Sequence, residues 1–186
     1  MIERSVGWLW ATIAVIAASG CGDSEGAGGS GGSDGAGGTA PTPEEVVIER
    51  FGAFEKAGFT RISMTGATSQ HGNAELVHIW VNDEAVAAYK AIDPDDAEAT
   101  AAPFPEGTML VKQNLDAGGE PTGAATVLAK QASGFNPDAG DWYWGRFDED
   151  GALAQGGVVA FCIDCHASNG LEATDWLNGV PAANQL

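Results

Sequence analysis

Residues 74–81 have the sequence AELVHIWV, and this stretch gives the clearest indication of the fold. β-Branched and aromatic residues dominate it, which is typical of a β-strand. Residues 108–115 (TMLVKQNL) and 142–148 (WYWGRFD) have the same character. Residues 126–131 are expected to form a partner strand, reached through a turn at Gly118-Gly119. The sequence therefore predicts several short antiparallel strands.

Helices are predicted at both ends of these strands. Residues 42–45 (TPEE) combine a capping Thr, a Pro at the first helical position and a Glu three residues after the cap. Gly58 is expected to end this first helix. Residues 59–65 (FTRISMT) alternate as a strand does, whereas 83–92 and 158–167 are predicted to be helical. The fold class is therefore α+β, a mostly antiparallel β-sheet with short flanking helices.

This domain is expected to span residues 42–186, and a segment of another kind precedes it. Residues 6–18 (VGWLWATIAVIAA) are an apolar run that is too short for a comfortable membrane span. They are typical of the apolar part of a secretion signal, which we assign to residues 1–20. Cys21 follows Ala18-Ser19-Gly20, which resembles the lipobox of bacterial lipoproteins. Ordinary signal cleavage nearby and an uncleaved anchor are the alternatives.

The residues after the expected signal indicate a tether. Residues 21–41 begin with the expected lipid-attachment Cys21 and are rich in Gly and Ser, so they favour a flexible linker between a membrane and the domain. We therefore expect an exported, membrane-anchored lipoprotein that faces the periplasm or the cell exterior, held to the membrane by its lipid only.

Charge excludes some partners. The chain has 26 acidic and 8 basic residues and a formal net charge of −18. Nucleic-acid binding requires Lys and Arg to neutralise phosphates, and docking on anionic lipid requires basic patches, so both are excluded. An acidic surface suits the steering of a basic electron-transfer protein.

The chemistry is indicated by Cys162-Ile163-Asp164-Cys165-His166. C-x-x-C-H is the attachment signature of c-type haem, in which two thiols add to the haem vinyl groups and the His binds the iron. With Cys21 assigned to lipid, the three cysteines are all accounted for. The sequence therefore predicts one covalent haem c as cofactor, attached to Cys162 and Cys165, with His166 as metal ligand.

Three other interpretations of the motif are open. A thioredoxin-like C-x-x-C is expected in a βαβ context, near the start of a domain rather than its end. A structural zinc site requires four ligands, and His71 and His78 lack finger-like spacing. A disulfide across two residues is possible but staples a fold poorly.

The sixth ligand of the iron is not evident in the sequence. No Met follows His166, and the internal Met64 and Met109 are more typical of a core. An open distal position is therefore favoured, which indicates ligand binding or catalysis rather than simple electron transfer. The alternative is an electron-transfer cytochrome c in which Met64 or Met109 completes the iron.

Residues 142–144 alternate, so Trp142 and Trp144 are expected on one face of the sheet and Tyr143 on the other. One face then forms core. The tryptophan face is either core as well or a wall of the haem site.

Residues 44–170 resemble the cytochrome P-460 family, which includes the β-sheet cytochromes c′ called c′-beta. The resemblance is carried by the AELVHIWVN strand, by FPEGTMLVK at 104–112, by WYWG at 142–145 and by CIDCHASN at 162–169. It implies a mostly antiparallel sheet that carries one haem c, commonly as a homodimer. It also implies that His166 is the proximal ligand and that the distal face is open.

Within this family, the position of Lys112 separates two functions. In members that oxidise hydroxylamine, a lysine at the end of this strand is covalently linked to the haem edge. In c′-beta members no such bond exists, and the open iron binds small gases such as nitric oxide. The resemblance places Lys112 at this position, although a strand lysine turned to solvent is the ordinary alternative.

Other candidate residues follow from the same resemblance. The hydroxylamine-oxidising members have an Arg where this chain has Val77 and His78. His78 is a candidate acid or base of the pocket. A distal carboxylate is also needed as a proton relay, and Asp148 and Glu149 are near the haem motif in sequence.

Overall fold

An antiparallel sheet forms the centre of the computed structural model, which describes residues 40–64, 67–68 and 76–186. The strand order in this part of the chain is β1-β3-β4-β5-β6-β7, and β2 pairs with β3. The strands are β1 (Phe59–Arg61), β2 (Ala67–Thr68), β3 (Leu76–Asn82), β4 (Met109–Leu115), β5 (Pro121–Lys130), β6 (Trp142–Phe147) and β7 (Leu153–Gly157). The α+β prediction is confirmed.

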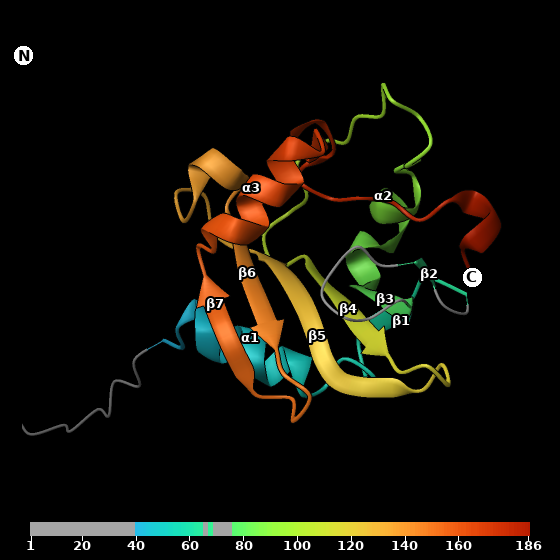
Figure 1. Ribbon diagram of the computed structural model, residues 1–186. Coiled ribbons are helices and arrows are strands. Elements are labelled where there is room, and N and C mark those ends of the chain that lie inside the picture. Colours follow the sequence, from blue (N-terminus) through green and yellow to red (C-terminus); the bar gives the residue numbers. More distant parts are fainter. Residues whose placement is uncertain (1–39, 65–66, 69–75) are drawn as a thin grey trace, which may run out of the picture. The chain divides into compact units, whose positions relative to one another are not determined.

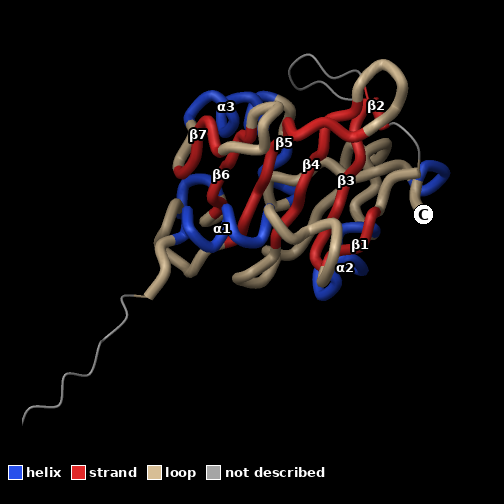
Figure 2. Tube along the Cα trace, turned by 90° about the horizontal axis from the view of Figure 1, so that it is seen from below, coloured by secondary structure: helices blue, strands red, loops and turns tan. Residues whose placement is uncertain are grey.

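Helices lie on both sides of this sheet. Figures 1 and 2 show α1 on one side and α3 on the other. The α-helices are α1 (Pro43–Phe51), α2 (Val86–Lys90) and α3 (Ala160–Ser168). Short 3₁₀ turns are η1 (Asp83–Ala85), η2 (Pro137–Ala139), η3 (Leu171–Thr174) and η4 (Ala182–Asn184). None of the described helices is long and apolar enough to cross a membrane.

The start of α1 agrees with the sequence, but its end does not. Thr42 Oγ1 accepts a hydrogen bond from the Glu45 amide at 3.3 Å, and the Glu45 carboxylate accepts one from the Thr42 amide at 2.7 Å. The expected stop at Gly58 was wrong, because α1 ends at Phe51. The chain turns there so that Phe54 packs against Trp80 of β3, with ring centroids 5.4 Å apart.

Several other boundaries moved. Regular pairing of β1 ends at Arg61, and Ser63 forms only an isolated bridge with Gln185, while residue 65 lies outside the described residues. The expected helix 83–92 divides into η1 and α2. Strand β5 begins at Pro121 rather than at residue 126, and β7 was not expected.

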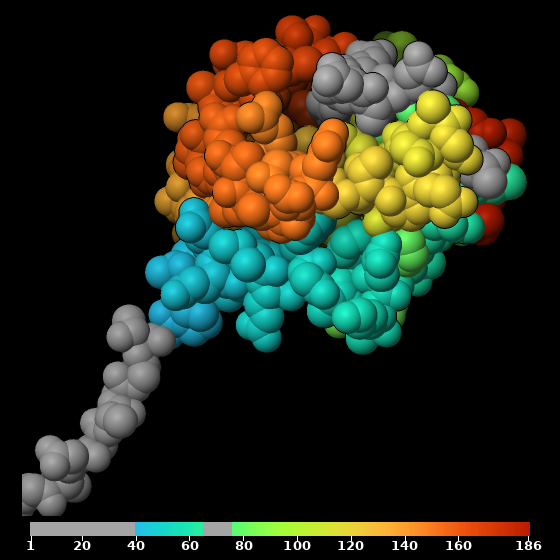
Figure 3. All heavy atoms as spheres, turned by 60° about the horizontal axis from the view of Figure 1, so that its bottom comes forward, coloured from blue at the N-terminus to red at the C-terminus, as the bar shows by residue number. Residues whose placement is uncertain are grey.

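The two faces of the sheet bury separate clusters. The α1 face holds Val47, Phe54, Met109, Val111, Ala125, Val127, Ala129, Tyr143 and Phe147. The α3 face holds Ile62, Val81, Ala85, Tyr89, Ile92, Phe104, Leu110, Ala139, Trp142, Trp144, Val159, Trp176, Leu177 and Val180. The expected division of Trp142 and Trp144 from Tyr143 is thus confirmed. In Figure 3 the blue and cyan atoms of residues 40–64 form a continuous layer along the bottom of the view.

The chain returns over the α3 face at its C-terminus. Figure 1 shows the red segment after α3 running across this face toward α2 and β3. Tyr89 of α2 donates a hydrogen bond to the Asn178 carbonyl at 2.8 Å, and Gln185 donates to the Lys90 carbonyl of α2 at 3.2 Å. These bonds hold the returning segment above the sheet and leave a space beneath it.

Candidate functional site

Helix α3 presents the C-x-x-C-H motif. Cys162 and Cys165 are three residues apart, so their side chains lie on neighbouring turns of one helix face. Cys162 is half-buried and packs against the α3-face cluster, whereas Cys165 is exposed. The two thiols are not joined by a disulfide. At the end of the helix, Ser168 and Asn169 both donate side-chain hydrogen bonds to the Cys165 carbonyl, at 2.8 and 2.7 Å.

His166 is held in one orientation by the backbone. Its ring is 9% exposed, and Nδ1 lies 2.7 Å from the Trp176 carbonyl oxygen. A carbonyl only accepts, so Nδ1 carries the proton and Nε2 is the unprotonated ring nitrogen, which is the form that binds a metal. Burial lowers the pKa of His166, an effect opposed by the bond to Trp176 and reinforced by the charge of Lys112. His166 is therefore neutral at neutral pH, as a ligand must be.

A cavity of about 500 Å³ lies between the sheet and the returning C-terminal segment, and both Lys112 and His166 line it. Lys112 is on β4, directly opposite Ile79 of β3 and Thr126 of β5. Much of the remaining lining is aliphatic and comes from the sheet and the C-terminal segment: Val77, Ile79, Leu110, Leu128, Leu177 and Val180. The structure thus brings together two residues that are 54 positions apart in the chain.

The cavity changes the chemistry of Lys112. Burial lowers its pKa from 10.5 to about 8, and the nearby Cys165 sulfur raises it in part. Desolvation disfavours the charged ammonium, so a sizeable fraction of the amine is neutral just above neutral pH. A neutral amine is both a nucleophile and a proton acceptor.

These residues fit a covalently held haem. The site combines an imidazole whose Nδ1 is already committed, two free thiols on the same helix and an apolar cavity. A large, flat and mostly apolar macrocycle requires such walls, and a c-type haem requires those three side chains. Among the described residues, no cluster of three His, Cys, Asp or Glu side chains has the form of a metal site.

The structure does not bring His78 into this site. His78 is paired with Gln113 on β4, so its side chain is on the α1 face, whereas the neighbouring Ile79 lines the cavity. Burial lowers the pKa of His78, with a smaller contribution from Arg61, while Gln113 and Glu55 raise it. The expectation of a pocket acid or base at this position is therefore wrong, because alternation along β3 turns the side chain away.

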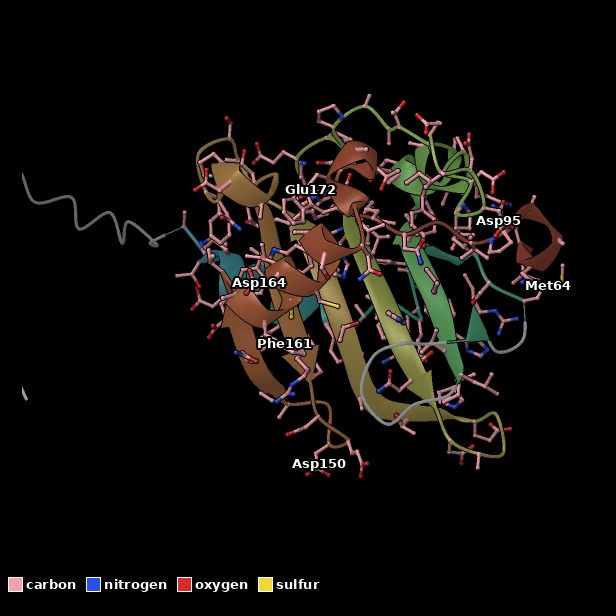
Figure 4. All side chains as sticks on the ribbon, turned by 45° about the horizontal axis from the view of Figure 1, so that its top comes forward. Met64, Asp95, Asp150, Phe161, Asp164 and Glu172 are labelled. Atoms are coloured by element: carbon pink, nitrogen blue, oxygen red, sulfur yellow. The ribbon has the colours of Figure 1, made fainter. Side chains whose placement is uncertain are left out.

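Neither methionine lines the cavity. Met109 is fully buried in the α1-face cluster. Met64 is 41% exposed, and its backbone amide donates to the Asn184 carbonyl at 2.9 Å. In Figure 4 Met64 lies far from Asp164 on α3. The structure thus gives no support to either methionine as a sixth ligand.

The carboxylate at the cavity is not one of those suggested by the sequence. Asp148 accepts the amides of Asp150 and Ala152 in the turn between β6 and β7, and neither Asp148 nor Glu149 lines the cavity. Asp95 does line it, from the loop after α2 (Figure 4). Its loop is an irregular acidic segment with no periodic pattern, so nothing in the sequence marked it.

Comparison with known proteins agrees with this site. The family model of cytochrome P460 matches residues 56–178, which is more than half of the chain and contains Lys112, Cys162, Cys165 and His166. No curated protein matches the chain significantly. No solved structure does so either. With its antiparallel sheet and its haem-binding motif on α3, the chain belongs to the cytochrome P460 family and is a haem protein of a family that acts on small nitrogen species.

Proposed function

We propose that this protein is a monohaem c-type cytochrome that binds small nitrogen species in the cavity lined by Lys112 and His166. Cys162 and Cys165 hold the haem covalently, and His166 coordinates its iron through Nε2. The bound haem supplies an iron centre for ligand binding and electron transfer.

The observation that carries the proposal is the shared cavity. Lys112 and His166 line one space whose walls include Val77, Ile79 and Leu128. Aliphatic walls exclude bulk water and offer few hydrogen bonds, which favours small ligands such as nitric oxide or hydroxylamine. No Met among the described residues lines this cavity, which counts against a methionine as the sixth ligand.

Lys112 decides between two activities. Its lowered pKa, about 8, supports a neutral amine. In the hydroxylamine-oxidising members of the family this amine is bonded to the haem edge; such a bond would replace one N–H and one ring C–H, with two protons released and two electrons passed to an external oxidant. With that bond, we propose that the protein oxidises hydroxylamine and passes the electrons to an external electron-transfer protein. Without it, the protein binds nitric oxide without turnover.

Oxidation of hydroxylamine also releases protons, and a carboxylate that lines the cavity can accept them. Asp95 lines the cavity from an exposed loop, so a proton taken by its carboxylate can pass to solvent. We therefore assign the role of proton relay to Asp95 rather than to Asp148 or Glu149.

Intact mass and visible spectra test the proposal together. We expect the exported protein to carry the mass of one haem, which survives acid–acetone extraction. Proteolysis should give a haem peptide that contains residues 162–166. If the same peptide also contains the Lys112 segment and the ferrous Soret band is strongly red-shifted, we expect the protein to oxidise hydroxylamine. If the bands are those of ordinary five-coordinate haem, we expect it to bind nitric oxide without turnover. Extractable haem, or the sharp bands of a six-coordinate Met/His haem, would contradict the proposal.

We also propose that the protein is a lipoprotein on the outer side of a membrane, with Cys21 as its lipidated first residue. The support is the apolar segment 6–18 and the Gly-rich tether that follows Cys21. A Cys21→Ala variant should lose membrane association and keep its haem. Persistent membrane binding would indicate an uncleaved anchor instead.

A further inference from the structure

We infer that the buried ion pair between Lys130 and Asp175 positions the proximal ligand His166, acting through the backbone of Asp175 and Trp176. The inference rests on the proposed function in one respect, that His166 coordinates the haem iron. It assigns a positioning role to two charged residues that do not line the cavity.

The ion pair is bidentate and buried. Lys130 Nζ lies 2.8 and 2.7 Å from the two carboxylate oxygens of Asp175, and each side chain is 8% exposed. Lys130 Nζ also lies 4.7 Å from the centre of the Trp142 ring, as in a cation–π contact. The Asp175 carboxylate accepts a further hydrogen bond from the Phe104 amide at 2.7 Å. The ammonium group of Lys130 and the carboxylate of Asp175 each have a further contact besides the other. A buried ion pair needs such additional contacts in order to be stable.

The backbone at this pair is strained. Asp175 has φ 51° and Trp176 has φ 71°, so two consecutive residues other than glycine are left-handed. Such residues persist only where their surroundings hold them. The Asp175 carbonyl accepts a hydrogen bond from the Trp142 indole at 2.9 Å, and the Trp176 amide donates to the Leu171 carbonyl at 2.6 Å. Together with the ion pair, these bonds fix the turn.

This turn fixes the direction of one backbone carbonyl group. The Trp176 carbonyl oxygen meets Nδ1 of His166 at 2.7 Å. The Trp144 ring borders the same imidazole, with centroids 4.7 Å apart and planes at 84°, which limits its rotation. A hydrogen bond from a ligand histidine to a carbonyl fixes its tautomer and raises its basicity, and second-shell bonds of this kind are among the means by which proteins tune haem iron. A loosened turn should thus weaken iron–histidine bonding.

The close packing around the turn supports this reading. A Cβ atom at Gly140 would lie 2.9 Å from the Asp175 carboxylate and 2.9 Å from the Trp176 ring. The segment before β6 therefore needs glycine at this point in order to leave room for the pair and the indole. The α3-face core therefore packs closely against this turn as well as against the helix that carries His166.

The iron–histidine stretching frequency of the ferrous haem protein, measured by resonance Raman spectroscopy, tests the inference together with the reduction potential. Asp175→Asn removes the charge, and Asn tolerates a left-handed φ and can still accept from the Phe104 amide. Lys130→Met removes the amine and keeps the apolar stem. We expect each variant to lower the frequency and to raise the potential, because the imidazole becomes a weaker donor. In the double variant, the frequency and the potential should shift no further than in the more strongly affected single variant. In Lys130→Arg, which keeps the positive charge, both should stay close to the wild-type values.

Two further variants separate positioning from folding. Trp142→Phe deletes the indole hydrogen bond to the Asp175 carbonyl without burying a charge, so it should produce the same direction of shift even if the charge variants fold poorly. Phe54→Leu lowers stability on the α1 face and should leave the frequency unchanged. A lower melting temperature with an unmoved frequency in the Asp175, Lys130 and Trp142 variants would overturn the inference. A ferrous wild-type protein that is five-coordinate by its visible spectrum and yet has no iron–histidine band would overturn ligation by His166, and with it both proposals.

Discussion

The two faces of the sheet are made by neighbouring residues of the same strands, yet they have opposite characters. On β4, Lys112 lines the cavity of the α3 face, while the adjacent Gln113 faces the α1 side, where it donates to Glu55 at 2.6 Å. On β3, Ile79 lines the cavity and His78 does not. Because the side-chain period of a strand is two, a shift of one residue decides whether a polar group meets the site or the structural core.

The faces also differ in how buried polar groups are used. On the α1 face they satisfy one another, as where the Trp80 indole donates to Gln113 at 3.1 Å. On the α3 face the Lys130–Asp175 pair does the same, but burial lowers the pKa values of Lys112 and His166, which line the cavity, and keeps both nearer the neutral form. The comparison suggests that one face holds the fold together and the other is adapted to chemistry.

The largest effect is expected from the thiols of the α3 face. A Cys162→Ser, Cys165→Ser double variant, matured with the export machinery, should carry no haem that survives acid–acetone extraction, because no thioether can form. Absorbance of the extracted protein measures the loss. Asp164→Ser, which changes an exposed residue of the same helix, is the matched control and should retain full haem. Retained haem in the double variant would contradict covalent attachment.

The next largest effect is expected from a matched pair across the sheet. Lys112→Leu should abolish hydroxylamine oxidation if Lys112 is bonded to haem, and should restore ordinary five-coordinate bands. It should leave nitric oxide binding intact, since gas binding requires only open iron and a small apolar pocket. His78→Leu should change neither property, because His78 does not line the cavity. Steady-state turnover and nitric oxide titration measure both variants.

Either of two results would break this comparison. Loss of turnover in the His78→Leu variant at normal haem content would place His78 in the reaction. A wild-type spectrum that already shows ordinary five-coordinate haem c would rule out a bond between Lys112 and the haem. Nitric oxide binding would then be the better description of the function.

The sequence predicted the strands and the motif well, because each is a local pattern. Strand β3 is β-branched and aromatic, C-x-x-C-H is a fixed spacing, and the capping box of α1 is complete within residues 42–45. The resemblance predicted Lys112 at the haem, and the structure has Lys112 and His166 lining one cavity although they are far apart in the chain. Local chemistry and family likeness together therefore pointed to two residues that the fold brings together.

What the sequence missed depends on tertiary contacts. Strand β7 is LAQGG, which has little strand character, yet a Cβ at Gly156 would clash with the Tyr143 hydroxyl, so the fold requires glycine there. The Trp176 carbonyl contributes to the site through its backbone, which no residue type reveals. Asp95 lines the cavity only through the tertiary placement of the loop after α2. The face taken by His78 follows from register, which a strand pattern alone leaves ambiguous.

An intermediate effect, on stability alone, is expected from Met109. Met109→Ala should lower the free energy of unfolding by about 2–5 kcal/mol, since it leaves a cavity in the closed α1-face core. The visible spectrum of the haem protein should not change. Chemical denaturation measures the first effect, and absorbance measures the second. Met64→Ala, at a residue 41% exposed, is the control and should change neither. A spectral shift in either variant would support that methionine as the sixth ligand of the iron.

The smallest effect is expected from Tyr143, on the α1 face. Burial, reinforced by the Glu44 carboxylate 3.4 Å away, raises the pKa of Tyr143 to about 12. The pKa of tyrosine in the unfolded chain is about 10, so the unfolded state releases its proton first as pH rises. The stabilisation contributed by the neutral phenol is therefore fully present below pH 10 and is lost between pH 10 and 12.

Tyr143→Phe should lower the free energy of unfolding by about 0.5 kcal/mol at pH 7, because the hydrogen bond is long. It should also flatten the decline in stability between pH 10 and 12, which denaturation at a series of pH values measures. An equally steep decline in the variant would show that Tyr143 does not titrate in this way.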